Sequence, residues 1–248
     1  SVVKNPPANA GGSDFNEHLI FRDGVVAGEN VIKLNFTSPI LTSGSAITRY
    51  VDKEDGSEYI YSLFDPSDAS TAFPAFDQPD LKARFSLEVR RPSDWSIVST
   101  TVADPYYEPH KGKGPSTLNA LDRFDETRPI NTHVFAFAAG PWAALSASRS
   151  EPRAVWIGNP YSTYSKRSPR STPPFIYVRE SQVAKLEQYA DEVFRLNREA
   201  VKYFEQYFDY TFPFPKYDLV LIPEFPFAGA GNAGATFLRE SSIIYAYQ

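Results

Sequence analysis

The 248-residue sequence contains no cysteine and no methionine, and it has only three histidines. Without cysteine, disulfide bonds, thiolate metal sites and thiol nucleophiles are all excluded. Because even an initiator Met is absent, we expect a fragment of a longer protein. The histidines, His18, His110 and His133, lie too far apart to be the paired ligands of an H-E-x-x-H helix. We therefore expect no metal-ligating residue in this chain.

Long apolar runs and an excess of positive charge are also absent. No stretch approaches the roughly 18 consecutive apolar residues of a membrane helix, and the first residues (SVVKNPPANAGGSDF) do not resemble a signal peptide. The net charge is −5, from 25 basic and 30 acidic residues scattered along the chain. Such a distribution offers no basic surface to a polyanion. We expect neither a membrane nor a nucleic acid as partner, and the compartment stays unknown.

The composition favours strands and loops over a helical bundle. Aromatic residues make up 15% of the chain, and 21 prolines divide it into short segments. Short runs rich in Val, Ile, Phe and Tyr, separated by turn-forming residues, predict a β-sandwich. The predicted strands are Glu17–Phe21, Asn30–Phe36, Tyr59–Leu63, Lys82–Val89, Ser96–Thr101 and His133–Ala139. The segment Asp104–Asn119 has no periodicity and predicts a long exposed loop.

The composition changes near Ser146, where a long segment rich in Ser, Pro and Arg begins. We place a domain boundary there, with residues 1–148 as the first domain and residues 149–248 as the second. Apolar residues then recur from Val183 to Phe208 and predict one long amphipathic helix with Ser181 as N-cap. Three further strands are predicted at Tyr217–Ile222, Ala235–Leu238 and Ile243–Tyr247. The expected fold class is mainly β with an α/β part.

Two segments carry a specific resemblance to a known family. They are Tyr61–Arg84 (YSLFDPSDASTAFPAFDQPDLKAR) and Phe208–Glu240 (FDYTFPFPKYDLVLIPEFPFAGAGNAGATFLRE). The first is similar to the F-P-C-F-D-E-P region, and the second to the G-[AG]-M-E-N loop, of the gluzincin zinc aminopeptidases related to aminopeptidase N. Ile130–Pro141 resembles the family's last sandwich strand, and Arg179–Phe208 resembles its first catalytic-domain helix. The resemblance implies a saddle-like β-sandwich followed by the start of a thermolysin-like catalytic domain.

The resemblance also implies a function. In this family, water bound to zinc attacks the first peptide carbonyl, and the Glu of H-E-x-x-H acts as general base. The sequence would then be an N-terminal fragment of a zinc metallopeptidase that removes N-terminal residues from peptides. Since H-E-x-x-H is absent, we expect the chain itself to bind no zinc and to be inactive. Its expected partners are a peptide substrate and the remaining part of its own polypeptide.

A carboxylate in the first matched segment is a candidate ligand for the substrate's α-ammonium group. An aminopeptidase needs carboxylates or amides at the closed end of its cleft to recognise that group. The resemblance places one such anchor three residues before the Asp of a D-A-R motif, and this offset from Asp68 reaches Asp65. Because Asp65 precedes Pro66, the alternative is a turn residue that bonds its own backbone.

The second family anchor is the Glu of the G-[AG]-M-E-N loop, and alignment on Asn232 places Gly231 at that position. Small residues let a peptide backbone approach closely, and an exposed edge could pair with substrate as an added strand. The predicted substrate-binding loop consists of Ala228, Gly229, Ala230, Gly231 and Asn232. One alternative is a plain Gly-rich turn. Another, favoured by the missing carboxylate, is a catalytically inactive peptide-binding or scaffold relative.

Other residues of the matched segments are expected to have structural roles. Ala75 and Gln78 replace the Cys and the Glu of the family pattern, at positions that we take as structural. Ion pairs or loop contacts are expected for Asp77, Arg84, Glu224, Arg239 and Glu240. A free-standing carbohydrate-binding β-sandwich would not account for the predicted long helix.

Overall fold

The computed structural model describes residues 2–5, 18–21, 23–104, 120–147, 155–157 and 174–244. The chain divides into two compact units, Ser1–Thr37 and Ser38–Gln248. Most of the loop expected at Asp104–Asn119 and the domain boundary expected at residue 148 lie outside the described residues.

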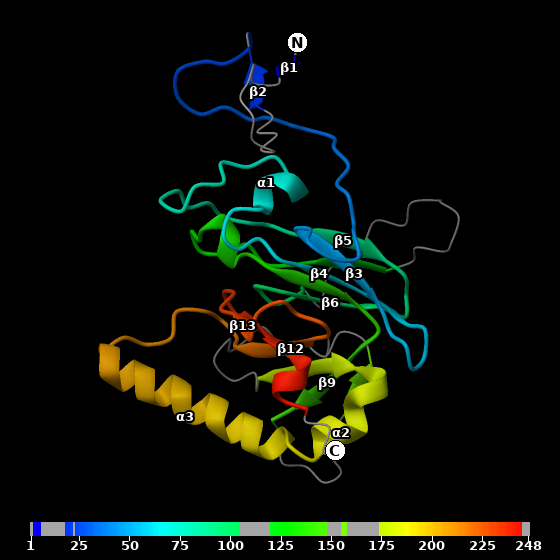
Figure 1. Ribbon diagram of the computed structural model, residues 1–248. Helices are drawn as coiled ribbons and strands as arrows, with labels where there is room; N and C mark the ends of the chain where they lie inside the picture. Colours follow the sequence, from blue (N-terminus) through cyan, green and yellow to red (C-terminus); the bar gives the residue numbers. More distant parts are fainter. Residues whose placement is uncertain are drawn as a thin grey trace. The chain divides into compact units, whose positions relative to one another are not determined.

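The first unit contains one antiparallel hairpin, in which β1 (Val2–Asn5) pairs with β2 (His18–Phe21) (Figure 1). The strand predicted at residues 17–21 is thus confirmed for its described part. The strand predicted at Asn30–Phe36 is wrong, because this segment belongs to no strand and no sheet. Val31 is 81% exposed, and without a partner strand an alternating apolar pattern does not produce a strand.

The second unit begins with two antiparallel sheets (Figure 1). A four-stranded sheet has the order β3-β4-β8-β6, and β5 pairs with β7 in a two-stranded sheet. The strands are β3 (Ile47–Val51), β4 (Glu58–Ser62), β5 (Glu88–Arg91), β6 (Ser96–Ser99), β7 (Ala120–Arg123) and β8 (Phe137–Gly140). Two short helices, α1 (Ala69–Ala72) and η1 (Thr132–Val134), lie in the connections.

The predicted strands at residues 59–63 and 96–101 are confirmed as β4 and β6. Two others begin later than predicted. β5 starts only at Glu88, and the segment at 133–139 starts as η1 and becomes β8 at Phe137. The rings of Phe85 and Phe135, which precede these strands, stack at 4.5 Å. Their apolar character therefore reflects packing in a core and not strand pairing.

A six-stranded sheet follows, with the order β10-β9-β11-β12-β14-β13. Its strands are β9 (Trp142–Ser146), β10 (Val155–Ile157), β11 (Phe175–Arg179), β12 (Asp218–Ile222), β13 (Gly229–Ala230) and β14 (Ala235–Arg239). The pairs β11–β12 and β12–β14 are parallel, and the other pairs are antiparallel. The predictions at 217–222 and 235–238 are confirmed as β12 and β14.

The end of the chain differs from the prediction. Ile243 and Ile244 follow the short helix η5 (Glu240–Ser242) and are not in a strand. The strand predicted at Ile243–Tyr247 is therefore wrong for its described part, and residues 245–247 lie outside the described residues. The amides of Ile243 and Ile244 donate to the Glu240 carbonyl, so a helical turn replaces sheet pairing here.

The single long helix of the prediction is interrupted. The segment forms η4 (Glu180–Gln182), α2 (Val183–Glu187) and α3 (Ala190–Phe208). Ser181 is not an N-cap, because its hydroxyl donates to the Asp52 carboxylate at 2.7 Å. Leu186 and Phe194 are buried, whereas Phe208 at the far end of α3 is 65% exposed. Only the first part of the predicted apolar face is therefore covered by described residues.

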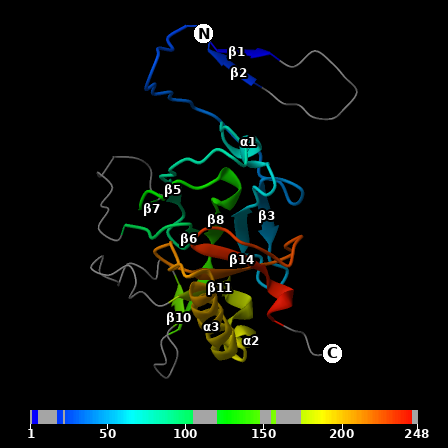
Figure 2. The same cartoon turned by 90° about the vertical axis from the view of Figure 1, so that its left-hand side faces the viewer.

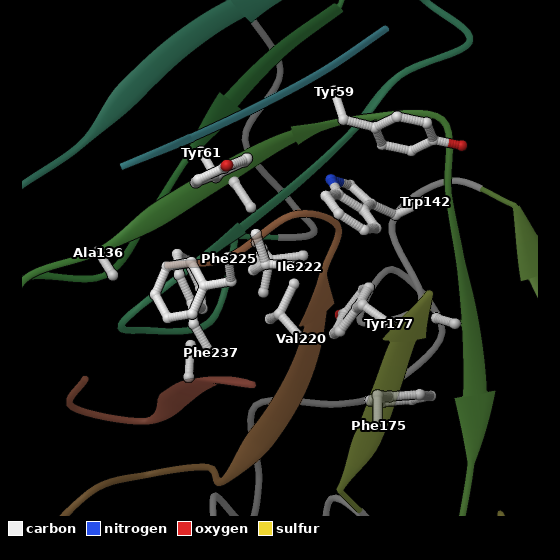
Figure 3. Close-up of a cluster of buried hydrophobic side chains, with 14 residues drawn as sticks. Tyr59, Tyr61, Ala136, Trp142, Phe175, Tyr177, Val220, Ile222, Phe225 and Phe237 are labelled. Carbon is white, nitrogen blue, oxygen red and sulfur yellow. The ribbon is translucent and has the colours of Figure 1, made fainter. Parts of the chain in front are cut away.

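The six-stranded sheet is buried on both faces. On one face, alternate residues such as Ile176 and Leu219 pack against α2 and α3, which lie along this sheet in Figures 1 and 2. On the other face, Tyr177 and Phe237 join Tyr61 of β4 in a second cluster (Figure 3). The four-stranded and six-stranded sheets thus share one core. Because both faces are buried, the sequences of β11 and β12 are apolar almost without interruption.

Candidate substrate-binding site

The Gly- and Ala-rich loop ends the six-stranded sheet. β13 pairs with β14 on one side, with Gly229 opposite Leu238, and it is the last strand in the sheet order. Ala228, Gly229 and Gly231 are exposed. A strand at a sheet edge presents main-chain N–H and C=O groups that an extended peptide can pair with. β13 is therefore a candidate for β-strand addition.

The glycines of this loop differ in whether the structure has room for a side chain at their positions. A Cβ on Gly229 would lie 2.9 Å from the Leu238 side chain and 3.1 Å from the Phe237 carbonyl oxygen. A side chain there would press against β14. Nothing lies within 4 Å of a Cβ on Gly231, and its φ is outside the left-handed region. A carboxylate side chain could therefore be introduced at Gly231 without steric conflict.

Asp65 lies in the exposed loop between β4 and α1, and its peptide bond to Pro66 is cis. Among the described residues, its carboxylate has no hydrogen bond or ion pair. The turn is closed by its neighbours, since the Asp68 amide donates to the Phe64 carbonyl at 3.0 Å. The carboxylate of Asp65 is thus not used to bond its own backbone, and it is accessible to a ligand.

Asp65 and the loop at 228–232 border the same apolar cluster. Phe64, directly before Asp65, is 2% exposed, and Ala233, directly after the loop, is 4% exposed. Both side chains belong to one buried cluster. The fold therefore brings the two matched segments together, although no contact between the Asp65 side chain and the loop is observed in the described part of the chain.

Arg239 holds the segment that leads into β13. Its Nε donates to the carbonyls of Phe225 and Phe227 at 2.9 and 3.1 Å, and its Nη2 donates to the Pro226 carbonyl at 2.7 Å. Its main-chain N–H donates to the Ala228 carbonyl at 3.0 Å. The expected role of Arg239 as a loop contact is confirmed.

The other residues expected to be structural also have such partners. Asp77 accepts hydrogen bonds from the Thr132 hydroxyl and the Ser70 amide. Arg84 pairs with Glu126 at 3.5 Å, and Glu224 pairs with Lys53 at 3.4 Å, both in exposed positions. Exposed pairs of this kind contribute little to stability.

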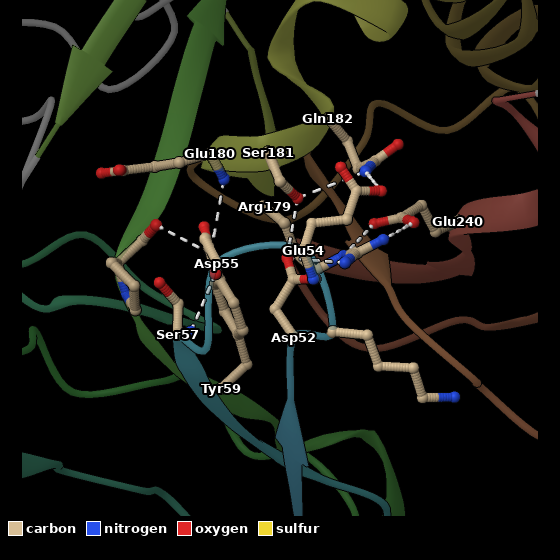
Figure 4. Close-up of polar contacts among 12 residues, drawn as sticks. Asp52, Glu54, Asp55, Ser57, Tyr59, Arg179, Glu180, Ser181, Gln182 and Glu240 are labelled. Carbon is tan, nitrogen blue, oxygen red and sulfur yellow. Dashed lines mark hydrogen bonds and ion pairs between the residues drawn. The ribbon is translucent and has the colours of Figure 1, made fainter.

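A buried ion cluster of Asp52, Arg179 and Glu240 joins the two large sheets (Figure 4). Arg179, at the end of β11, lies 2.7 Å from Asp52 and 2.5 Å from Glu240. Their side chains are 8%, 1% and 12% exposed, respectively. The Arg179 guanidinium also lies 5.4 Å from the centre of the Tyr50 ring. The only sequence signal for this cluster is weak, namely charged residues directly at the ends of apolar runs.

Asp52 and Arg179 both carry their charge at neutral pH. Burial raises the pKa of Asp52, but hydrogen bonds from the Glu54 amide and the Ser181 hydroxyl and the charge of Arg179 lower it, and the net pKa lies below the ordinary value of 3.8. Burial lowers the pKa of Arg179, but Glu240, Tyr50 and Asp52 together raise it more, so the net pKa is above its ordinary value. The charges of Asp52 and Arg179 are thus held together in a site with little access to water.

We expect Asp52 to make the fold sensitive to acid. The pKa of Asp52 is lower in the folded state than its ordinary value of 3.8. Its ionised form therefore contributes fully to the free energy of unfolding above pH 3.8, and this contribution is lost as pH falls through the folded-state pKa. The difference in unfolding free energy between wild type and Asp52→Asn should be constant at neutral pH and should shrink below about pH 4. Urea unfolding of both proteins at a series of pH values measures this difference. A difference that stays constant throughout the acid range would contradict this assignment.

The described residues do not supply a zinc site. No group of three or more His, Cys, Asp or Glu side chains in the described part of the chain is placed to hold a metal ion. His133 lies in η1, whereas His110 is outside the described residues and so is the His18 side chain. Among the helices that are described, none is both long and apolar enough to cross a membrane.

Known proteins match this chain over both of its parts. Residues 16–134 match the Peptidase M1 N-terminal domain, and residues 193–248 match the Peptidase family M1 domain. Aminopeptidase N of Streptomyces lividans is 30% identical over 229 residues, which cover 92% of this chain and 23% of that protein. Probable M1 family aminopeptidase 1 of Encephalitozoon cuniculi is 27% identical over 233 residues, with coverage of 92% and 23%.

Endoplasmic reticulum aminopeptidase 1 of Rattus norvegicus is 28% identical over 189 residues, which cover 73% of this chain and 16% of that protein. The chain therefore spans 23% or less of these relatives. The two domain matches follow the order of the structure, with the first over β2 to β7 and the second over most of α3 and β12 to β14. The chain belongs to the M1 peptidase family, and it consists of the N-terminal domain of that family followed by the beginning of its catalytic domain.

Proposed function

We propose that this chain works as the N-terminal part of a zinc aminopeptidase, in which it binds the amino end of a peptide substrate. Residues 1–148 would form the first domain and residues 149–248 the start of the second. The observation that carries the proposal is β13, which is the edge strand of the six-stranded sheet among the described residues and in which Gly229 is exposed. A peptide that adds to this edge gains main-chain hydrogen bonds independent of its sequence. Such binding suits a peptidase with many substrates.

Asp65 is the proposed partner of the substrate's α-ammonium group. Its carboxylate is exposed and has no partner among the described residues. A hydrogen bond between an ammonium and a carboxylate is about twice as strong as one between neutral groups. In this arrangement, residues 228–232 hold the peptide main chain, and Asp65 restricts binding to peptides with a free amino end.

Zinc, when bound in M1 enzymes, supplies the activated water for hydrolysis. We expect the purified 248-residue chain to contain no stoichiometric zinc and to hydrolyse no aminoacyl substrate. The reason is that the sequence has no H-E-x-x-H motif and the described residues form no metal-binding group. Elemental analysis and an aminoacyl anilide assay check both points. One tightly held zinc per chain would overturn the expectation.

The role of Asp65 is tested by Asp65→Ala in a longer M1 protein that contains this chain. Loss of one charge-assisted hydrogen bond, worth about 1.5–3 kcal/mol, should lower kcat/KM for free-amine peptides by one to two orders of magnitude. Asp80→Ala is the matched control, because Asp80 is also exposed and lies in the same matched segment. Equal kinetics of the two variants, with unchanged stability, would show that Asp65 is only a turn residue.

The second candidate function is peptide binding without catalysis, as in a scaffold protein. The observation that favours it is Gly231, which carries no carboxylate at the family's Glu position. In that case the longer protein should bind peptides with no turnover, and a carboxylate introduced at position 231 should strengthen binding without producing hydrolysis. Turnover of any free-amine peptide by the longer protein would exclude this candidate.

A further inference from the structure

The segment that precedes β13 depends on few contacts. Residues 224–227 lie in a turn and bends before β13 and belong to no strand. Phe225 anchors the segment, since it is 2% exposed and its ring lies 6.1 Å from that of Tyr61. Glu224, directly before it, has a φ of 50°, a conformation that is unfavourable for a residue with a Cβ. Such a segment needs a further contact to keep one conformation.

Arg239 provides this contact. Its guanidinium donates to three consecutive main-chain carbonyls, those of residues 225, 226 and 227. A planar guanidinium has its donors in a fixed arrangement, so three simultaneous bonds define the positions of the three peptide groups. The segment continues directly into β13, and the position of that edge strand therefore depends on Arg239.

The residue after Arg239 belongs to the buried ion cluster. Glu240 receives two hydrogen bonds from Arg179, at 2.8 and 2.5 Å. Arg179 in turn contacts Asp52, which follows β3 of the four-stranded sheet. Because Arg239 and Glu240 are adjacent in the chain, a shift of Glu240 necessarily moves the backbone from which Arg239 reaches the segment at 225–227.

We propose that the buried ion cluster of Asp52, Arg179 and Glu240 positions the peptide-binding edge strand through Arg239. Asp52 is then a positioning residue from the N-terminal domain that acts on a loop of the catalytic domain without contacting it. This inference rests on the proposed function, since it assigns β13 as the strand that substrate pairs with. The alternative is that the cluster only stabilises the packing of the two sheets.

Amide hydrogen exchange in the longer M1 protein separates these possibilities. We expect Arg239→Met to accelerate exchange of the β13–β14 amides by about tenfold or more, because charge-assisted hydrogen bonds are lost. Arg239→Lys keeps the positive charge but lacks the planar arrangement of several N–H donors, and it should have a smaller effect. Asp52→Asn should accelerate the same amides severalfold. Exchange in β5 and β7 serves as the internal reference, because these two strands pair with each other and neither pairs with the strand that contains Arg239.

The matched control for Asp52→Asn is Glu58→Gln, which removes an exposed ion pair with Arg49 from the same β3–β4 hairpin. This control should leave exchange of β13 and β14 unchanged. In a protein with peptidase activity, Asp52→Asn should also raise KM severalfold for free-amine peptides while kcat changes less, because the edge strand binds ground state and transition state alike.

Two results would overturn the inference. One is a lower melting temperature of Asp52→Asn with exchange of the β13–β14 amides unchanged relative to β5 and β7, which would leave the cluster with a purely stabilising role. The other is an equal effect of Glu58→Gln on these amides. The exchange measurement does not require catalysis. A protein without peptidase activity but with coupled exchange would refute the proposed function and support the positioning role.

Discussion

Replacing Arg179 with Met is expected to destabilise the folded chain by about 3–5 kcal/mol, because the change leaves two buried carboxylates without their cation. Arg179 bonds both Asp52 and Glu240, whose side chains are 1% and 12% exposed. Met fills a similar volume but offers no hydrogen-bond donor. For a chain of this size, the loss corresponds to a fall in melting temperature of roughly 10 °C.

Urea unfolding of wild type and Arg179→Met measures this effect. Arg195→Met is the control, since Arg195 pairs with Glu192 on the exposed surface of α3 and both side chains are more than half exposed. The control should have no measurable effect on stability. Arg179→Met with wild-type stability would show that the cluster does not stabilise the contact between the sheets, and it would also remove the basis for its positioning role.

Introducing a carboxylate with Gly231→Glu is expected to raise kcat/KM for free-amine peptides by roughly 10- to 100-fold in the longer protein. A buried or half-buried α-ammonium that cannot replace its water contacts loses about 1–3 kcal/mol, and a second carboxylate would recover that amount. The site has room, because nothing lies within 4 Å of a Cβ at Gly231. The backbone there is also compatible with a side chain.

Gly231→Gln is the control for this prediction, because it adds nearly the same volume without the charge. We expect it to give a much smaller gain than Gly231→Glu. N-acetylated peptides have no ammonium group, so neither variant should improve their hydrolysis. A vigorous aminopeptidase with Gly at position 231 that gains nothing from Glu would show that the amine is bound elsewhere.

Local sequence patterns predicted a strand correctly where the apolar segment finds a partner strand in the fold. The run Tyr217–Ile222 became β12 because it is covered on both faces. β11 was not predicted, since Phe175–Arg179 follows a long segment rich in Ser, Pro and Arg that obscures it. The segment Asn30–Phe36 has the right pattern but no partner strand. Strand formation thus depends on long-range pairing that a local pattern does not contain.

In the candidate site, too, local motifs indicate some residues, whereas contacts between distant segments cannot be predicted from them. Motif resemblance located Asp65 and the loop at 228–232, because these segments have a characteristic order of residue types. It did not indicate that Asp52, Arg179 and Glu240 meet, because their three segments are far apart in the chain and are joined only by packing of the sheets. Arg239 was expected to contact a loop, but its three carbonyl partners depend on the conformation of residues 225–227.

Binding of the peptide amino end by this chain is tested most directly by the selectivity for one peptide with a free or an acetylated amino group. The ratio of the two kcat/KM values should be measured in the longer protein for wild type, Gly231→Glu and the double variant Gly231→Glu/Asp65→Ala. We predict that the ratio rises by roughly 10- to 100-fold in Gly231→Glu, and that it falls again when Asp65 is removed. The same ratio in all three proteins would contradict the proposed site.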